Sequence, residues 1–196
     1  DATALATPRS PRSANAPLRL LYLGMLPEWR PIEPLLDALQ ARGDAVELTI
    51  HGYVYDKARR RIAADPLLAR GVRLRPMVAY AASHALAAAA DCQLVVIGPR
   101  HLDNVPSKFF EYLGHHKPML ILGPPQNPLR GIVERLGIGL YVDGRDAEGI
   151  AAALGTLRAN AAALAEAYTT NAEALAAYSA PRVAQHFCTL LDEVLS

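Results

Sequence analysis

Short apolar runs bounded by glycine or proline alternate with amphipathic segments along most of this chain. Uninterrupted apolar runs of this length are typical of parallel strands buried on both faces, and apolar positions spaced i, i+3, i+4 predict helices. The runs place strands at 18–24, 45–50, 72–74, 93–98, 119–122 and 139–142. The amphipathic segments place helices at 32–42, 56–64, 79–90, 128–136, 147–158, 161–178 and 181–195. This alternation predicts an α/β fold: a Rossmann-like, doubly wound parallel sheet of about six strands, flanked by helices and followed by C-terminal helices.

The first 17 residues differ from the rest, because Ala, Ser, Pro and Arg dominate them without apolar periodicity. We predict a flexible linker over 1–17 and one domain over 18–196. A chain of 196 residues is long enough for one well-packed domain and not obviously for two. No run approaches the ~20 apolar residues of a transmembrane helix, so we expect no membrane span.

The charge balance and the cysteine content limit the functions that this chain can be expected to have. The chain has 20 basic and 19 acidic side chains, and this balance gives no reason to expect a nucleic-acid partner. Cys92 and Cys188 are far apart and lack metal-ligand spacing, which fits thiols in a reducing compartment. We therefore expect a cytoplasmic protein without a metal site. The basic segment 56–64, with Arg59 to Arg61, leaves peripheral association with the inner membrane face as an alternative.

Parallel α/β sheets bind ligands beyond the carboxyl ends of their strands. The predicted strands place the loops 24–31, 51–55, 76–79, 98–106 and 123–128 at that edge. Each of these loops contains glycine or proline, and glycine permits a close approach of ligand to backbone.

The segment 103–114, between two of the predicted strands, carries the clearest candidate chemistry. Pro106 suits the first position of a short helix, and Gly114 suits a left-handed residue just past its end. Apolar residues at i, i+3, i+4 are predicted to face the core: Phe109, Tyr112 and Leu113.

A second face of the same helix carries Ser107, Lys108 and Glu111. The free amides of residues 106–108, the hydroxyl and the ammonium suit a phosphate, and a carboxylate one turn further suits a vicinal diol. This is the layout of a nucleoside diphosphate. The residues by themselves leave a second interpretation open, in which this is a capped helix with solvated side chains.

The segment Asp103 to Pro118, with the core Pro-Ser-Lys-Phe-Phe-Glu-Tyr-Leu followed by Lys117-Pro118, resembles the nucleotide-sugar signature of retaining glycosyltransferases of family 4. These enzymes have the two-Rossmann-domain fold called GT-B. The resemblance implies that Glu111 binds the donor ribose. It also implies that Asp103, eight positions earlier, approaches the donor sugar, although the family usually has Glu there.

The resemblance extends over residues 18–196, the whole donor-binding C-terminal half. It implies that the backbone at Gly24 and Gly52 and in the segment with Met77 and Val78 contacts the donor nucleotide. The step at Tyr178-Ser179 resembles the entry to a last helix, which in GT-B enzymes crosses back to the first domain. Nothing in this chain resembles the N-terminal acceptor domain.

One departure from the family pattern affects the diphosphate. Family members usually have Arg directly after the first glycine and Lys a few residues later, whereas Met25 follows Gly24 here and Arg30 lies near the Lys position. We therefore assign Arg30 and Lys108, with Pro106 and Ser107 at the helix start, to the diphosphate. The expected catalytic group is Asp103, Glu111 and Arg30.

The expected function is that of the donor-binding half of a retaining, hexosyltransferase-type enzyme of polysaccharide biosynthesis. It would use a nucleoside diphosphate sugar, without a metal or other cofactor. A glycan, lipid or small-molecule acceptor would be bound through the missing domain, so the isolated chain should bind nucleotide and transfer little or nothing. Two alternatives remain open: a non-catalytic nucleotide-binding or interaction module, and half of a sugar-nucleotide epimerase. A dehydrogenase does not fit, because no Gly-x-Gly-x-x-Gly follows the first strand.

Four histidines and one tryptophan are the remaining candidate site residues. His115 and His116 are predicted to be surface residues near a helix end. His51 and His101 follow predicted strands and are candidates for sugar contacts, as an alternative to structural roles. Trp29 suits either stacking on a ligand ring or packing within its loop.

Overall fold

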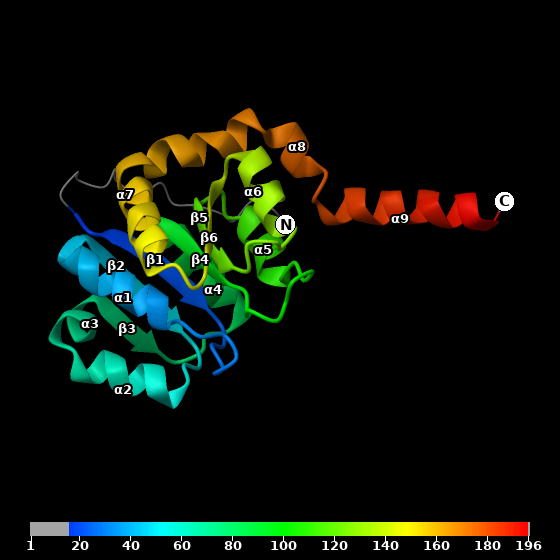
Figure 1. Cartoon of the computed structure of the whole chain (residues 1–196). Coiled ribbons are helices and arrows are strands. Elements are labelled where there is room, and N and C mark those ends of the chain that lie inside the picture. Colours follow the sequence, from blue (N-terminus) through cyan, green and yellow to red (C-terminus); the bar gives the residue numbers. More distant parts are fainter. Residues whose placement is uncertain (1–15, 196) are drawn as a thin grey trace.

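The computed structural model describes residues 16–195, except for the side chains of Ala180 and Leu195. The linker predicted over 1–17 lies outside the described residues, apart from its last two. Six parallel strands form one sheet: β1 (Leu18–Leu23), β2 (Val46–His51), β3 (Val72–Arg75), β4 (Cys92–Val96), β5 (Met119–Gly123) and β6 (Gly139–Asp143). The helices are α1 (Glu33–Arg42), α2 (Asp56–Ala64), α3 (Pro66–Gly71), α4 (Tyr80–Ala89), α5 (Ser107–Leu113), α6 (Leu129–Leu136), α7 (Ala147–Thr170), α8 (Ala172–Ala176) and α9 (Ala180–Leu195) (Figure 1).

The strand order is β3-β2-β1-β4-β5-β6. The chain first adds β2 and β3 on one side of β1 and then adds β4, β5 and β6 on the other side, so the direction in which the sheet grows reverses between β1 and β4. This is the doubly wound arrangement that the sequence predicts. All strands run parallel, and the register aligns Leu23 with His51 and His51 with Arg75. The ends of β1, β2 and β3 therefore lie at one edge, which is where ligands bind in sheets of this kind.

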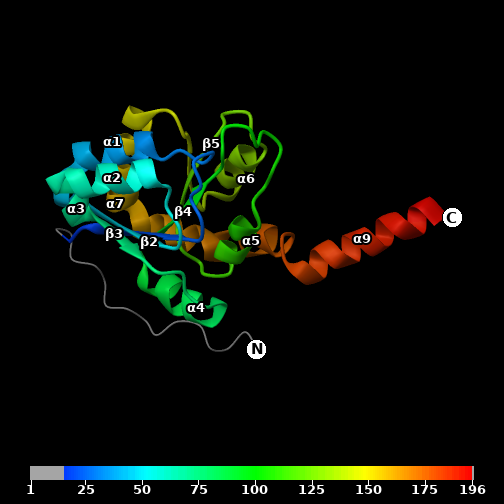
Figure 2. The ribbon, with the colours of Figure 1, turned by 90° about the horizontal axis from the view of Figure 1, so that it is seen from below.

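Both faces of the sheet are covered, which explains why its central strands are largely apolar. Leu20 and Tyr22 of β1 belong to a core with α1, α2, α3 and the first half of α7. Leu21 and Leu23 belong to a second core with α4, α5 and α6. Figure 2 shows α1 to α3 on one side of the sheet and α4 on the other. Because side chains alternate along a strand, each central strand contributes to both cores.

Two helical features differ from the sequence prediction. The helix α3 was not predicted. It begins at Pro66 after Asp65, whose carboxylate accepts hydrogen bonds from the backbone amides of Leu67 and Leu68, both at 2.9 Å. The predicted break between 158 and 161 is a kink within α7, where Asn160 has non-helical φ and ψ of −120° and 16°. The segment predicted as one helix over 161–178 is mostly helical, but α7 ends at Thr170 and α8 follows Asn171 and ends at Ala176.

The ends of α5 correct two further predictions. Pro106 is extended, with φ −67° and ψ 142°, so the helix begins one residue later. Gly114 is right-handed, with φ −67°, and the left-handed turn falls instead on His116, with φ 51°. The predicted core face is confirmed by Phe109 and Tyr112, which are 0% and 1% exposed.

The last helix, α9, projects away from the sheet and its covering helices (Figure 1). Every side chain of α9 that the structure describes is exposed. Several of them are large and apolar: Val183, Phe187, Leu190, Leu191 and Val194. Within residues 16–195, no helix is long and apolar enough to cross a membrane.

Candidate functional site

A glycine turn follows each of the strands β1 and β2 at its carboxyl end. Gly24 and Gly52 have φ values of +121° and +139°, which L side chains rarely adopt. The Gly24 amide donates to His51 O at 2.8 Å, and the Gly52 amide donates to Arg75 O at 3.0 Å. These bonds link the ends of β1, β2 and β3 into one backbone rim that carries no side chain at either glycine.

Lys108 lies against this rim. A Cβ built on Gly24 would fall 2.8 Å from Lys108 Nζ, so the ammonium occupies the space beside the glycine. The helix carrying Lys108 is held there by Tyr112, whose hydroxyl oxygen accepts from the Leu23 amide at 3.3 Å. The structure thus brings Gly24, Gly52 and Lys108 together at the point where sheet growth reverses.

Arg30 has a different environment. Its guanidinium carbon lies 4.5 Å from the centre of the Trp29 ring, and it lowers the pKa of Tyr22 against the larger raising effect of burial. Arg30 belongs to the loop after β1, and the Tyr22 hydroxyl donates to Met25 O of the same loop at 2.9 Å. Trp29 is also 5.0 Å from the His101 ring, yet it stays half exposed. Trp29 therefore packs against the loop after β4 and keeps a free surface.

The remaining predicted residues lie on separate elements along the same edge. Asp103 is exposed on the loop before α5, and Glu111 is exposed one turn into that helix. Met77 is exposed and Val78 half-buried in the loop after β3. Glu111 also borders an apolar hollow of about 1040 Å³ between α5, α8 and α9. Among the described residues, no ion pair joins any of these four side chains to another.

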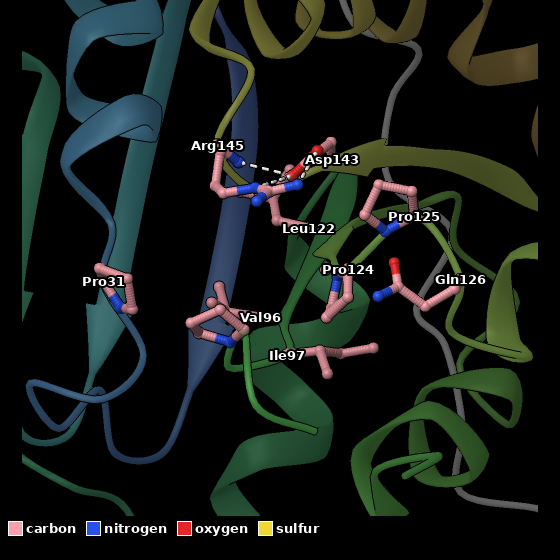
Figure 3. A pocket seen from close by; sticks show the side chains of 12 residues that line it. Pro31, Val96, Ile97, Leu122, Pro124, Pro125, Gln126, Asp143 and Arg145 are labelled. Atoms are coloured by element: carbon pink, nitrogen blue, oxygen red, sulfur yellow. Dashed lines mark hydrogen bonds and ion pairs between the residues drawn. The ribbon is translucent and has the colours of Figure 1, made fainter. Parts of the chain in front are cut away.

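A smaller cavity of about 230 Å³ lies across the carboxyl ends of β4, β5 and β6 (Figure 3). Its floor is apolar, with Val96, Ile97 and Leu122, and prolines line its sides. Asp143 and Arg145 form an ion pair of 2.9 Å at its rim, and this bond holds the pKa of Asp143 below its usual range.

The loop after β6 was not among the loops predicted to bind ligand. The signal was present, because Asp143-Gly144 repeats the strand-to-glycine step seen after β1 and β2. An apolar floor with a carboxylate, a guanidinium and the Gln126 amide at its edge suits one ring with polar substituents.

His115 departs from its prediction, since it is half-buried and hydrogen-bonded rather than an exposed surface residue. Its Nδ1 lies 2.8 Å from Gln93 Nε2 and its Nε2 lies 3.0 Å from His84 Nδ1. Gln93 is fully buried in β4, and its side-chain oxygen has no hydrogen-bond partner. Burial, with repulsion from His84 and His116, lowers the pKa of His115 to about 4. The ring is therefore neutral near pH 7.

We expect the free energy of unfolding to decrease as the pH falls from 6.5 towards 4. The folded-state pKa of His115 is about 4, so the unfolded chain binds a proton in this range that the folded protein does not bind. The expected loss is about 1 kcal/mol, less than full linkage because solvent screens a half-buried ring. Urea unfolding of the wild type and of His115→Gln at both ends of this range measures it. The same pH slope in His115→Gln and in the exposed control His186→Gln would contradict the prediction.

No group of three or more His, Cys, Asp or Glu side chains suited to a metal ion occurs among the described residues. Cys92 is buried and Cys188 is exposed, and both are free thiols. Burial raises the pKa of the Cys92 thiol. We find no role for either cysteine at the carboxyl edge.

Comparison with known proteins gives matches in structure and none in sequence. No protein-family model and no curated protein matches this sequence. Among solved structures, HepE from Anabaena, in complex with UDP, has a TM-score of 0.73 at 17% identity, over 92% of this chain and 50% of HepE. This chain shares its fold with glycosyltransferases.

Further solved structures agree with this fold. The sucrose-phosphate synthase of Thermosynechococcus elongatus has a TM-score of 0.69 at 19% identity, over 94% of this chain and 47% of the synthase. The C-terminal domain of LpcC, a glycosyl transferase group 1 family protein from Francisella tularensis, has a TM-score of 0.59 at 11% identity, over 78% of this chain and 85% of that domain. The chain spans about half of HepE and of the synthase, and most of the LpcC domain.

Proposed function

We propose that this chain is the donor-binding half of a retaining glycosyltransferase that uses a nucleoside diphosphate sugar. The observation that carries this proposal is the position of Lys108. Its ammonium lies beside Gly24 at the carboxyl end of β1, where the strand order of the sheet reverses towards β4. A diphosphate can approach this rim closely, because Gly24 and Gly52 carry no side chains. The UDP complex of HepE, a structure of the same fold, supports a nucleotide ligand of this class.

Each proposed residue has a separate task. Lys108 and the hydroxyl of Ser107 bind the diphosphate and stabilise the negative charge that grows on the leaving group. Glu111 accepts two hydrogen bonds from the ribose hydroxyls. Asp103 contacts the donor sugar. Arg30 is the second proposed cation, and it lies on the loop that begins at Gly24.

The acceptor would be a glycan, a lipid or a small molecule bound by a second domain. Two observations support a missing domain: the chain spans only about half of HepE, and the exposed apolar side chains of α9 are suited to packing against another unit. The proposed enzyme needs both halves. We therefore expect the isolated chain to bind nucleotide and to transfer little or no sugar.

A second candidate function is a nucleotide-binding module without catalysis. The side chain that follows Gly24 is Met25, which is 57% exposed and supplies no positive charge to the diphosphate. A sugar-transfer assay with the full-length protein separates the two candidates. Transfer supports the enzyme, whereas nucleotide binding without transfer to any acceptor supports the module.

The test of donor binding is calorimetric titration of this chain with UDP, GDP and ADP. We expect one diphosphate to bind preferentially and Glu111→Ala to weaken it about tenfold or more, because hydrogen bonds to a charged group are lost. Glu166→Ala, which removes an exposed carboxylate on α7, is the matched control and should bind like the wild type. Binding of none of the three nucleotides at millimolar concentration would overturn the proposal.

A further inference from the structure

The loop between β4 and α5 carries Asp103 on a segment with no regular structure of its own. Residues 102–104 are exposed and lie in no helix or strand. Among residues 16–195, no backbone-to-backbone hydrogen bond joins residues 102–105 to another part of the protein. Exposed segments with so few backbone bonds open easily. The carboxylate of Asp103 therefore keeps one position only if side chains from other elements hold the loop.

Asn127 provides such a contact from the neighbouring loop, the one after β5. It is 2% exposed, and its Nδ2 donates to His101 O at 3.0 Å and to Asn104 O at 3.1 Å. These two carbonyls lie on either side of Leu102 and Asp103 in the chain. A primary amide carries two hydrogens, so one side chain can donate to both carbonyls at once. Asn127 thus fixes the backbone on both sides of Asp103.

The partners of Asn127 determine which end of its amide faces the loop. Nδ2 faces two carbonyl oxygens, which only accept, and Oδ1 faces the Leu129 amide, which only donates, at 3.0 Å. The opposite orientation would set donor against donor and acceptor against acceptor. Both amide hydrogens are therefore used on the loop, and the amide oxygen is used at the start of α6.

The turn that presents Asn127 is itself tied to the sheet. The backbone amide of Asn127 donates to Pro124 O at 3.0 Å, and the Tyr141 hydroxyl of β6 donates to the same oxygen at 2.7 Å. Pro124 directly follows Gly123, the last residue of β5. The hydrogen bonds therefore run from two strands, through Asn127, to the backbone around Asp103.

The proposed diphosphate residue Lys108 is held by different contacts. The helix that carries it, α5, is fixed by its buried apolar face and by the hydrogen bond from the Leu23 amide to Tyr112. Among the described residues, Asn127 makes no hydrogen bond to α5. Loss of the Asn127 amide should therefore loosen the loop at Asp103 while Lys108 stays in place.

We propose that Asn127 is a positioning residue that holds Asp103 towards the donor sugar, so that the site prefers a nucleotide sugar to the free nucleoside diphosphate. This inference rests on the proposed function, which takes Asp103 as the residue that contacts the sugar. Aspartate has a short side chain, so its carboxylate reaches a fixed point only from a fixed backbone. A free diphosphate has no sugar for Asp103 to contact, and its binding depends on Lys108 and not on Asn127.

A purely structural role for Asn127 leads to a different expectation. If the amide only started α6 and packed the loop, its loss would lower the stability of the protein and weaken every nucleotide ligand by the same factor. The ratio of nucleotide-sugar affinity to diphosphate affinity separates the two roles, because a uniform loss of affinity cancels in the ratio.

The test is calorimetric titration with UDP, GDP and ADP, and with the glucose and mannose conjugates of the diphosphate that binds best. Asn127→Ser removes both donors to the loop and keeps an oxygen that can accept from the Leu129 amide. We expect this variant to reduce the ratio of conjugate affinity to diphosphate affinity by about fivefold or more, because a hydrogen bond from the sugar to a carboxylate is lost. Its affinity for the free diphosphate should stay close to that of the wild type.

Asn171→Ser is the matched control. The Asn171 Nδ2 donates to Leu136 O at 2.8 Å, at the opposite end of α6, so this change removes the same kind of bond away from the loop. It should leave both affinities unchanged. Thermal unfolding checks that each variant folds. If Asn127→Ser does not fold, Asn127→Asp replaces it, since an ionised carboxylate keeps the size of the side chain and accepts from Leu129 but cannot donate to the loop.

Asp103→Ala shows whether Asn127 acts through Asp103. In this background Asn127→Ser should not reduce the affinity ratio further, because the group that Asn127 positions is gone. The positioning role would be overturned, with donor binding intact, by an additive loss, by an unchanged ratio in Asn127→Ser, or by a wild type that prefers neither conjugate to the free diphosphate. A wild type that binds none of the three diphosphates would overturn the proposed function and this inference together.

Discussion

Gly52→Ala is expected to destabilise the protein by about 4 kcal/mol, the range of the most damaging single substitutions. The new Cβ would fall 1.9 Å from Gly24 O and 2.7 Å from Gly24 C. Backbone atoms cannot swing aside as a long side chain can, so the two strand ends would have to separate. Separation would break the bonds from Gly24 to His51 and from Gly52 to Arg75. Urea unfolding, or loss of soluble protein in the extreme case, measures the effect.

Gly43→Ala is the control for Gly52→Ala. Gly43 also has a positive φ, of +55°, but nothing lies within 4 Å of its Cβ position. With a ψ of −136°, Gly43 lies in a backbone region that is nearly restricted to glycine, so its variant should show only a conformational penalty of about 1–3 kcal/mol. The difference in lost stability between the two variants measures the cost of the clash between a Cβ at position 52 and the Gly24 backbone. If both lose the same stability, the two turns do not pack against each other in solution.

Lys108→Ala is expected to weaken binding of the preferred nucleoside diphosphate by about 10–100-fold, because a charge-assisted bond to phosphate is lost. Lys108 Nζ lies beside Gly24, the position that a diphosphate would approach. The protein should fold normally, since the ammonium makes no described ion pair with a carboxylate. Calorimetric titration of wild type and variant at one salt concentration measures the change.

Lys57→Ala is the matched control for Lys108→Ala. Lys57 is an exposed lysine on α2 that pairs with Glu33 at 3.0 Å, so its loss removes the same charge from a different surface. It should leave nucleotide affinity close to that of the wild type. Equal affinities in the two lysine variants would show that Lys108 does not contact the diphosphate.

Most of the fold could be predicted from periodicity, because burial on both faces makes parallel strands apolar throughout. All six strands were predicted, and so was the alternation with helices that leads to one parallel sheet. The helix α3 was not, because its six residues hold too few apolar positions to show a period. The ends of α5 were each misplaced, since neighbouring conformations satisfy the same local preferences.

The candidate site could be predicted in part. Gly24, Gly52 and Lys108 each carry a local signal, and the structure shows the two glycines in contact and the lysine beside one of them. His115 was predicted to be a surface residue, but it is half-buried. Its burial depends on Gln93 and His84, which are 22 and 31 residues away along the chain. A short sequence window contains no information about such neighbours.

The sequence by itself determined which segments become strands, which residues turn the chain at the strand ends, and which charged side chains begin α5. Those properties depend on each residue and a few neighbours along the chain. Only the tertiary structure decided that Lys108 reaches Gly24, that His115 contacts Gln93, and that the described side chains of α9 stay exposed. The strand order sets these proximities, and that order results from the packing of whole helices on both faces of the sheet.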